Sequence, residues 1–407
     1  MLVVYASPLI RDDIEQFLRA LLRIDGVRLA LLTQDRPQRL TPDLADALVA
    51  LERVEDSLDT GQVHRALQSL KNRFGPIHRL LAVNEQIQVP LAEMRERFGV
   101  QGMGVEAAVN FRDKARMKYL FEQNGVPCAR SGCATSSEEV RAFVERVGLP
   151  IVLKPLAGAA TQSTFRAIDA PSLAEALASN PPSPHNPVLL EEFVTGEERT
   201  LETLSLNGRP LWHSVTQYSP TALHAVETPW IQWCLLTPTD PVEAGLPEIQ
   251  SVGERAIAAL GMGTGMSHLE WFRQADGRVV VGEVAARPPG SQIFKAANYA
   301  YDMCMYTTWT RLMVLDDFVP PPLQRRYAVG SVFLRGHGGS RIVRTHGLEE
   351  ALAHLGEMVV EGRTPRPGET AHATYTGNGY VQIRHAETSV VRDALRYLQD
   401  HVRVELA

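Results

Sequence analysis

The sequence predicts an α/β protein made of more than one domain. Strands and helices alternate over residues 1–109, a second strand and helix segment follows, and the chain after residue 194 has β-type patterns joined by short turns. With 407 residues, at roughly 150 residues per domain, two or three domains are expected.

The first 109 residues have the pattern of a parallel, Rossmann-like α/β unit. An apolar strand at 2–5 precedes an amphipathic helix whose one face carries Ile14, Phe17, Leu18, Leu21 and Leu22. Strands are expected at 27–32 and 77–83, and a helix at 90–98 that ends at Gly99. No Gly-x-Gly-x-x-Gly follows the first strand, so a dinucleotide site is not expected there.

The middle of the chain begins with a Lys- and Arg-containing helix at 111–124, which Gly125 and Pro127 stop. A helix at 137–147, a buried strand at 151–154 and a strand at 188–194 follow. Hairpin turns are predicted at Asn207-Gly208 and Asp276-Gly277. A proline-rich linker at 317–323 leads to strands at 329–334 and 380–384 and to a closing amphipathic helix that contains Val390, Val391, Ala394, Leu395 and Leu398.

Composition excludes several classes of function. The hydrophobic fraction is 44%, the charged fraction is 22%, and apolar stretches fall short of the roughly 18 residues of a membrane span. Lys plus Arg is 41 and Asp plus Glu is 47, and the resulting net charge of −6 gives no broad positive field for nucleic acid. Four cysteines are too few for a disulfide scaffold, and no basic residue precedes the first apolar stretch as in a secretory signal, so we expect the cytoplasm.

Two lysines are candidate anion-binding groups. The chain has five lysines, at 71, 114, 118, 154 and 295, so its other 36 basic residues are arginine. Lys114 starts a helix, and Lys154 ends a buried apolar strand. Because an unpaired buried ammonium group is costly, Lys154 must reach solvent or meet an anion. The anion-binding interpretation is favoured for Lys154, whereas the position of Lys114 alone favours neither anion binding nor simple exposure to solvent.

Two further segments suit a nucleotide. Residues 156–164 are small or carry hydroxyls, and backbone N–H groups of such a loop can approach phosphate oxygens. No Gly-Lys-Ser/Thr of a Walker loop occurs. The run Glu191-Glu192-Phe193-Val194 ends an apolar strand in a hinge that can offer its backbone to a flat base, and Glu198 is placed for a ribose diol. Solvated carboxylates at a strand end are the alternative.

A pair of carboxylates suggests a metal. Glu270 and Glu283 lie 13 residues apart on two predicted strands joined by the Asp276-Gly277 turn, so they could face each other. Facing carboxylates repel unless a cation separates them, and Mg²⁺ with nucleotide phosphates is a natural occupant. The alternative is an exposed pair too far apart to interact.

In order and spacing, these motifs together resemble the ATP-grasp superfamily of carboxylate-amine ligases over residues 105–293. The resemblance implies an ATP-grasp fold, α/β with an α+β lid and a Rossmann-like first domain. It implies a pre-ATP-grasp domain at 1–109, a lid domain at 110–200, a central domain with the metal site at 201–320, and a C-terminal α/β segment at 321–407 that packs on the central domain.

The resemblance also implies roles for individual residues. Lys114 and Lys154 resemble the lysines that contact the nucleotide phosphates, Glu270 and Glu283 the magnesium ligands, and Arg287 the arginine that steadies the transferred phosphoryl group; His268 would border the substrate pocket. The implied nucleotide-binding residues further include Ala157, Gly158, Thr161, Ser163, Glu191, Glu192, Phe193, Val194 and Glu198. One departure is Ala285, where the family pattern Glu-x-Asn-x-Arg has asparagine.

Residues Gly102-Met103-Gly104 and 265–270 most resemble the L-amino-acid ligase and carnosine-synthase-like branch. The implied activity joins a small-molecule carboxylate and an amine, expected to be amino acids, through an acyl phosphate, with release of ADP and phosphate. The implied cofactors are ATP and Mg²⁺, or Mn²⁺ in its place. Two alternatives stay open: a carboxylase-like or purine-biosynthetic enzyme that uses bicarbonate or formate, and an ATP-binding regulator without catalysis. A homodimer is a guess only.

Overall fold

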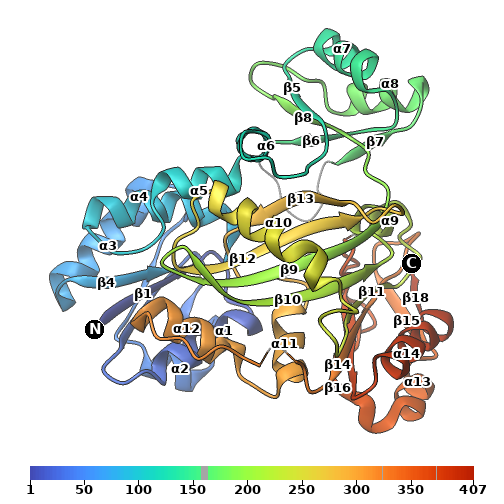
Figure 1. Cartoon of the computed structure of the whole chain (residues 1–407). Helices are drawn as coiled ribbons and strands as arrows, with labels where there is room; N and C mark the ends of the chain where they lie inside the picture. The colour runs from blue at the N-terminus through green and yellow to red at the C-terminus, as the bar shows by residue number, and fades with distance from the viewer. Residues whose placement is uncertain (157–163, 323, 373) are drawn as a thin grey trace.

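The structure is a computed structural model that describes residues 1–156, 164–322, 324–372 and 374–407. A small sheet with two helices stands above a larger body, in which a four-stranded sheet and an eight-stranded sheet lie side by side (Figure 1). This arrangement has the mixture of helix and strand that the sequence predicts. Within the described residues, no helix combines the length and the apolar character needed to cross a bilayer.

The N-terminal sheet is parallel, as the alternating pattern predicts. Its order is β3 (Ala50–Arg53), β2 (Arg28–Thr33), β1 (Leu2–Ser7) and β4 (Ile77–Leu81). Successive side chains of β1 serve two different cores, because Val3 and Tyr5 pack with α1 (Asp12–Leu22) while Leu2 and Val4 pack with α3 (Thr60–Phe74). The remaining elements of this part are α2 (Pro42–Ala47), α4 (Gln88–Phe98), η1 (Pro37–Arg39) and η2 (Glu85–Ile87).

The helix predicted at 111–124 is present, but its predicted start is wrong, because one helix ends and another begins at Asp113. α5 (Val105–Arg112) ends at Asp113, and α6 (Lys114–Gln123) begins directly after it. Asp113 has an extended backbone, and its side chain accepts a hydrogen bond from the backbone N–H of Arg116 at 3.0 Å. An aspartate in this role caps a new helix, so Lys114 stands at its first position.

The upper sheet is antiparallel in the order β5 (Ser131–Ala134), β8 (Val188–Glu192), β6 (Ile151–Pro155) and β7 (Phe165–Ala167). Helices α7 (Ser137–Val147) and α8 (Ala170–Ser179) cover one face, where they pack on Ile151 and Leu153. Strand alternation therefore turns Val152 and Lys154 to the opposite face, toward the larger body.

The central sheet is antiparallel throughout. Its order is β13 (Val279–Ala285), β12 (Gly265–Arg273), β9 (Glu197–Leu206), β10 (Arg209–Ser219), β11 (Trp233–Thr237), β14 (Ala328–Leu334), β17 (Gly379–His385) and β16 (Val359–Arg363). Both predicted hairpin turns are present; Asn207 and Gly208 have φ of 52° and 78°, as a two-residue hairpin between right-twisted strands requires.

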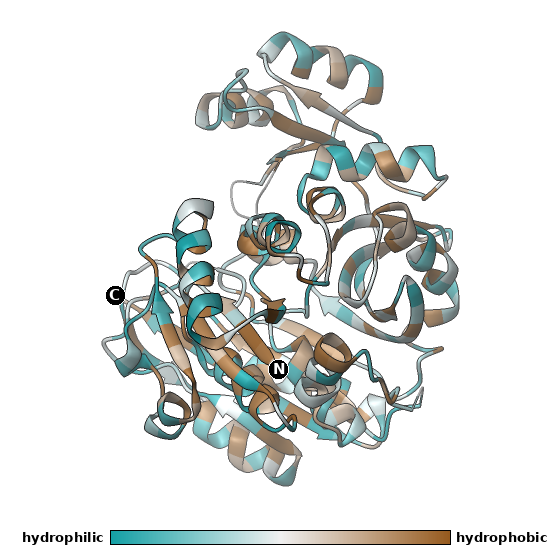
Figure 2. Ribbon diagram, turned by 90° about the vertical axis from the view of Figure 1, so that its left-hand side faces the viewer, coloured by the Kyte–Doolittle hydropathy of each residue, from teal (hydrophilic) through white to brown (hydrophobic). Residues whose placement is uncertain are grey.

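Helices cover this sheet, and the C-terminal segment extends it. They are α9 (Ala222–Glu227), α10 (Leu246–Ala259), α11 (Ile293–Tyr301), α12 (Met305–Leu315), α13 (Leu348–Leu355) and α14 (Thr388–His401), with η3 (Gly356–Met358) and the β15 (Ile342–His346) and β18 (Arg403–Leu406) pair at the edge. β14 hydrogen-bonds to β11 along its length, so the C-terminal strands continue the central sheet. Apolar colour concentrates on the strands and on the inward faces of the helices (Figure 2).

The helices α5 and α6 share their core with the central sheet. Phe111, Met117 and Phe121 are buried in one cluster with Leu201 and Trp271. The upper sheet has a separate core of its own. We therefore propose that the lid begins after residue 126 rather than at 110.

Candidate active site

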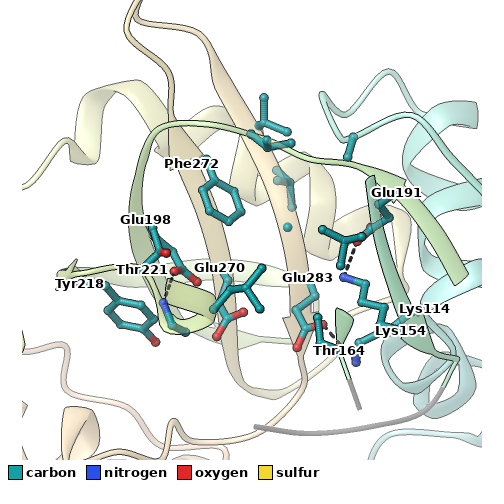
Figure 3. Close-up of a pocket in the computed structure, with 18 of the residues that line it drawn as sticks. Lys114, Lys154, Thr164, Glu191, Glu198, Tyr218, Thr221, Glu270, Phe272 and Glu283 are labelled. Carbon is teal, nitrogen blue, oxygen red and sulfur yellow. Dashed lines mark hydrogen bonds and ion pairs between the residues drawn. The ribbon is translucent and has the colours of Figure 1, made fainter. Parts of the chain in front are cut away.

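A cavity of about 440 Å³ lies between the upper sheet, the central sheet and the N-terminal part. It brings together every described residue that the sequence singled out for nucleotide, metal or catalytic work. These are Lys114, Lys154, Glu191, Glu192, Phe193, Val194, Glu198, His268, Glu270, Glu283 and Arg287. Figure 3 shows the acidic pair between Glu198 on one side and the lysines on the other. The predicted phosphate-loop residues Ala157, Gly158, Thr161 and Ser163 lie outside the described residues.

Glu191 links two lysines at the lid side of the cavity. Its carboxylate forms ion pairs with Lys154 and, at 2.8 Å, with Lys118. Burial alone would raise the pKa of Glu191, but the two ammonium groups outweigh it and lower that pKa to about 2. Lys118 also donates to the backbone carbonyl of Gly282 at 2.6 Å. The buried carboxylate thus fixes Lys154 in position at the end of its strand.

The acidic pair meets across the β12–β13 hairpin. Glu270 and Glu283 are direct cross-strand partners, as their spacing predicts. Lys114 lies 3.0 Å from Glu283. Burial would raise the pKa of Glu283, but Lys114 and Lys154 lower it to about 2. Burial and then the charge of Glu270 raise the pKa of Glu198 to about 8. The two pKa shifts are opposite because Glu283 lies beside lysines, which favour its charged form, whereas Glu198 lies near the negative charge of Glu270, which disfavours ionisation.

This donor set fits a magnesium ion bound together with a nucleotide. Mg²⁺ typically takes one or two carboxylates and completes its shell with phosphate oxygens and water. Across the described ranges, no group of three or more His, Cys, Asp or Glu side chains could hold a metal without other ligands. Glu270 and Glu283 would therefore hold the ion jointly with phosphate oxygens rather than form a closed protein cage.

His268 lies two residues before Glu270, on the same side of β12. Its Nδ1 is 2.9 Å from Glu202 on the neighbouring strand β9, and its Nε2 is 3.8 Å from Glu270. Burial would lower the pKa of His268, but the hydrogen bonds to Glu202 and Glu270 raise it to about 9. The two carboxylates thus favour the protonated form of His268 at the cavity wall.

Arg287 is tied to the N-terminal part. Its guanidinium contacts Glu85 at 2.8 Å, and the other oxygen of Glu85 accepts from Arg112 at 2.9 Å. Glu85 belongs to η2, directly after the parallel sheet, so three parts of the chain close around the cavity. A carboxylate shared by two arginines holds Arg287 in a defined orientation.

The segment between β8 and β9 connects the lid to the central sheet. The predicted strand at 188–194 ends two residues early, at Glu192. The carboxylate of Glu192 pairs with Arg130 at 2.5 Å, so this side chain is engaged within the lid. The Arg166 guanidinium lies 5.1 Å from the centre of the Phe193 ring. At Gly196, with φ of 152°, a Cβ would lie 2.5 Å from the carbonyl oxygen of Arg273, so only glycine permits this close crossing.

Sequence reasoning missed Lys118, Glu202 and Glu85. Lys118 had a signal, because it lies four residues after Lys114 and therefore on the same face of one helix. Glu202 and Glu85 had none, since their partners His268 and Arg287 are 66 and 202 residues away in the chain.

Comparisons with known proteins agree with this geometry. Residues 119–297 match the family model of the ATP-grasp domain. The chain is 25% identical over 304 residues to the L-arginine-specific L-amino acid ligase of Bacillus subtilis, covering 72% of this chain and 70% of that protein. It is 28% identical over 208 residues to the alanine–anticapsin ligase of Bacillus subtilis strain 168, covering 46% and 43%. The crystal structure of an L-amino acid ligase from Bacillus licheniformis superimposes with a TM-score of 0.78 at 17% identity, over 100% and 98% of the two chains.

Residues 119–297 thus match an ATP-grasp domain, and the fold of the chain resembles that of an ATP-grasp ligase. Its relatives of similar sequence include ATP-grasp ligases that form carbon–nitrogen bonds, among them an L-amino acid ligase. The sequence-based predictions of the fold, of an ATP-grasp ligase and of amide or peptide bond formation are thereby confirmed.

Proposed function

We propose that the enzyme joins the carboxylate of one amino acid to the amine of another through an acyl phosphate, with ATP and Mg²⁺. One observation carries the proposal: Lys114 and Lys154 line the same cavity as the facing pair Glu270 and Glu283. Cations that meet phosphate oxygens and carboxylates that hold a divalent ion are the two halves of a magnesium-nucleotide site.

Each residue has a proposed role that its position supports. Lys114 and Lys154 would bind phosphate oxygens, and Glu191 keeps Lys154 aimed at them. The backbone of 191–194 would meet the adenine, and Glu198 the ribose. Bound magnesium would neutralise phosphate charge and orient the γ-phosphate. Arg287, fixed by Glu85, would offset charge on the transferred phosphoryl group.

The proposed reaction has two steps. A carboxylate oxygen of the first amino acid attacks the γ-phosphorus, the bond to the bridging oxygen of ADP breaks, and ADP leaves. The amine of the second amino acid then attacks the acyl carbon, the carbon–oxygen bond breaks, and phosphate leaves with that oxygen. One proton is released from the amine. The substrate oxygen therefore ends in inorganic phosphate.

Water must be kept from the acyl phosphate, and the lid has a contact that serves this purpose. Arg166 on β7 pairs with Glu227 on α9 at 2.7 Å, so the lid is joined to the central part across the cavity. Closure of such a lid excludes water and keeps the reactants in place.

The free state of all four cysteines suits a reducing compartment, which supports the cytoplasm as the place of action.

Transfer of labelled oxygen tests the mechanism directly. Pairs from the twenty L-amino acids, labelled with ¹⁸O in the carboxylate, are incubated with ATP, Mg²⁺ and the enzyme. For an active pair we expect one ¹⁸O atom in the released phosphate, together with ADP and a dipeptide. Release of AMP and pyrophosphate would reject the acyl-phosphate mechanism.

The same assay separates the two alternatives. Phosphate release that requires bicarbonate or formate and no amino acid would favour the carboxylase-like function. Binding of ATP, measured by calorimetry, without turnover on any pair would favour a non-catalytic ATP-binding protein.

A further inference from the structure

A second cavity, of about 280 Å³, lies between the N-terminal part and the central part. The loops 101–104 and 261–265 form part of its wall, with β4 on the N-terminal side. Five of its lining residues are glycines, Gly102, Gly104, Gly261, Gly263 and Gly265. Gly263 borders open space, because a Cβ there would meet no atom within 4 Å, whereas the other four glycines let neighbouring atoms approach closely.

The charge of this cavity is positive. Among its described lining residues the charged side chains are Arg79, Arg95, Arg287 and Asp316. Arg79 is paired with Asp316 at 3.1 Å, and Arg287 with Glu85. Apolar side chains, including those of Met103, Met262, Met266, Trp309 and Met313, make up much of the rest of the wall.

Arg95 is the exceptional group of the cavity. Its side chain is only 5% exposed, and no carboxylate of the described chain lies within ion-pair distance of it. Its Nε donates to the carbonyl of Leu80 at 2.9 Å and its Nη1 to that of Met103 at 3.3 Å. Nη2 has no hydrogen-bond partner among the described residues. Gly102 lies over its aliphatic stem, where a Cβ would be 2.8 Å from Cδ.

Another arginine shows what a purely structural role looks like. Arg335 is 4% exposed and, like Arg95, has its pKa lowered to about 10 by burial. Its Nε, Nη1 and Nη2 donate to the carbonyls of Thr374, Ile231 and Ala225, at 3.1, 2.9 and 2.7 Å. Arg335 lines neither the first nor the second cavity. Arg95, in contrast, lines a cavity, and its Nη2, which has no partner among the described residues, is not fully buried and can be reached by a ligand.

We propose that this second cavity binds the carboxylate of a small amino acid or dipeptide through Arg95. A carboxylate would accept from the free guanidinium donors, and the methionine-rich wall would hold an apolar body. Two sources share this chemistry. The ligand is either the amine-donating substrate, whose own carboxylate is not activated, or a reaction product or effector. Only the substrate assignment rests on the proposed ligase function.

Arg287 links the second cavity to the first. It lines both cavities, and Ala286 and Pro288 on either side of it line the second. A ligand at Arg95 is thus separated from the nucleotide site by the arginine that would steady the phosphoryl group. Occupancy of one cavity can therefore influence the other through this side chain.

Binding without nucleotide tests the site independently of catalysis. The thermal midpoint of the full-length protein is measured with each L-amino acid, with leucyl dipeptides, and with the matching amides that lack the carboxylate. We expect at least one free acid to raise the midpoint and its amide to have no effect. Absence of a shift with every free acid, or an equal shift with the amide, would overturn the proposal.

Variants locate the site. Arg95→Met should weaken the observed binding at least tenfold, because a charge-assisted hydrogen bond is lost, while Arg95→Lys should retain part of it. Gly263→Val should also abolish binding, since a Cβ at this position meets no atom within 4 Å and the added side chain projects into the cavity. Arg335→Met is the matched control, which loses a buried arginine but should bind as the parent does. Unchanged affinity in Arg95→Met and Gly263→Val would overturn the assignment.

Kinetics separate the two sources of ligand. If the ligand is the amine-donating substrate, Arg95→Lys raises the KM of one amino acid and leaves the KM values of ATP and of the other amino acid unchanged. If it is a product or effector, both substrate KM values stay constant and the added ligand alters the rate. Failure of the ligase assay with binding intact would reject the proposed function and not this site.

Discussion

The two cavities differ in how their charges are balanced. Counted over the described residues, the wall of the first has six carboxylates and five Lys or Arg side chains, and its lysines are paired with Glu191 and Glu283. Counted in the same way, the second has three arginines and one aspartate. A site with both signs of charge suits an ion and a polyanion that bind together, whereas a site with surplus cation suits a lone anion. Charge balance thus separates a nucleotide site from an anion site more clearly than cavity size does.

The largest effect is expected from Lys154→Met. Removal of one donor to a transferring phosphoryl group typically costs about a hundred- to a thousandfold in kcat. The change also leaves the buried Glu191 with Lys118 alone. Phosphate release at saturating ATP measures kcat, and circular dichroism checks the fold. Lys71→Met is the control, since Lys71 is exposed on α3. A parental rate in Lys154→Met would show that the first cavity does not bind the phosphates.

A large effect is also expected at the acidic pair. Glu283→Gln removes one charge from the cross-strand pair, and we expect the Mg²⁺ concentration for half-maximal activity to rise about tenfold or more, about 1.4 kcal/mol per factor of ten. Titration of phosphate release with Mg²⁺ measures this shift. Glu138→Gln is the control, because its carboxylate is exposed on α7, where it pairs with Arg141. An unchanged magnesium requirement would place the ion elsewhere.

A smaller effect is expected of Glu198 on the way the stability of the folded protein changes with pH. The pKa of Glu198 is raised to about 8 in the folded state, so the folded protein keeps a proton there that the unfolded chain has lost. Glu198 therefore lowers stability progressively between about pH 4.5 and pH 8, fully above pH 8 and not at all below pH 4.5.

Glu198→Gln removes this penalty and can still accept the hydrogen bond from the Ala222 N–H. We expect equal thermal midpoints for the variant and the parent near pH 4.5, and a higher midpoint for the variant at pH 8, by about 2–4 °C per kcal/mol. Melting curves in a metal chelator at both pH values measure the difference. A constant difference at all pH values would contradict a buried, neutral Glu198.

The smallest effect is expected from Ala285→Asn. Ala285 lies two residues after Glu283 on β13, so an asparagine there would point to the same face as the predicted metal ligand. We expect the Mg²⁺ requirement to fall by a few fold, since an amide oxygen suits this ion. Ala286→Asn, on the opposite side of the chain, is the control. A raised requirement would show that the space at Ala285 serves the substrate instead.

Local sequence signals predicted those elements and cavity residues whose positions depend on their neighbours in the chain. Glu270 and Glu283 face each other because one short turn joins their strands, so spacing alone predicted the pair. Lys154 was predicted from a buried strand that ends in an ammonium group. The start of the helix predicted at 111–124 was wrong for a local reason too, since the capping side chain of Asp113 begins a new helix at Lys114.

By itself the sequence determined the parallel first unit, the hairpins and the residue types that we propose for a magnesium-nucleotide site, because periodicity and turn chemistry act over a few residues. Only the tertiary structure decided that Glu191 shares two lysines, that Glu85 holds Arg287, and that Arg95 faces a cavity with no acidic partner among the described residues. These contacts join segments far apart in the chain. Their energies depend on burial and distance, which no local pattern records.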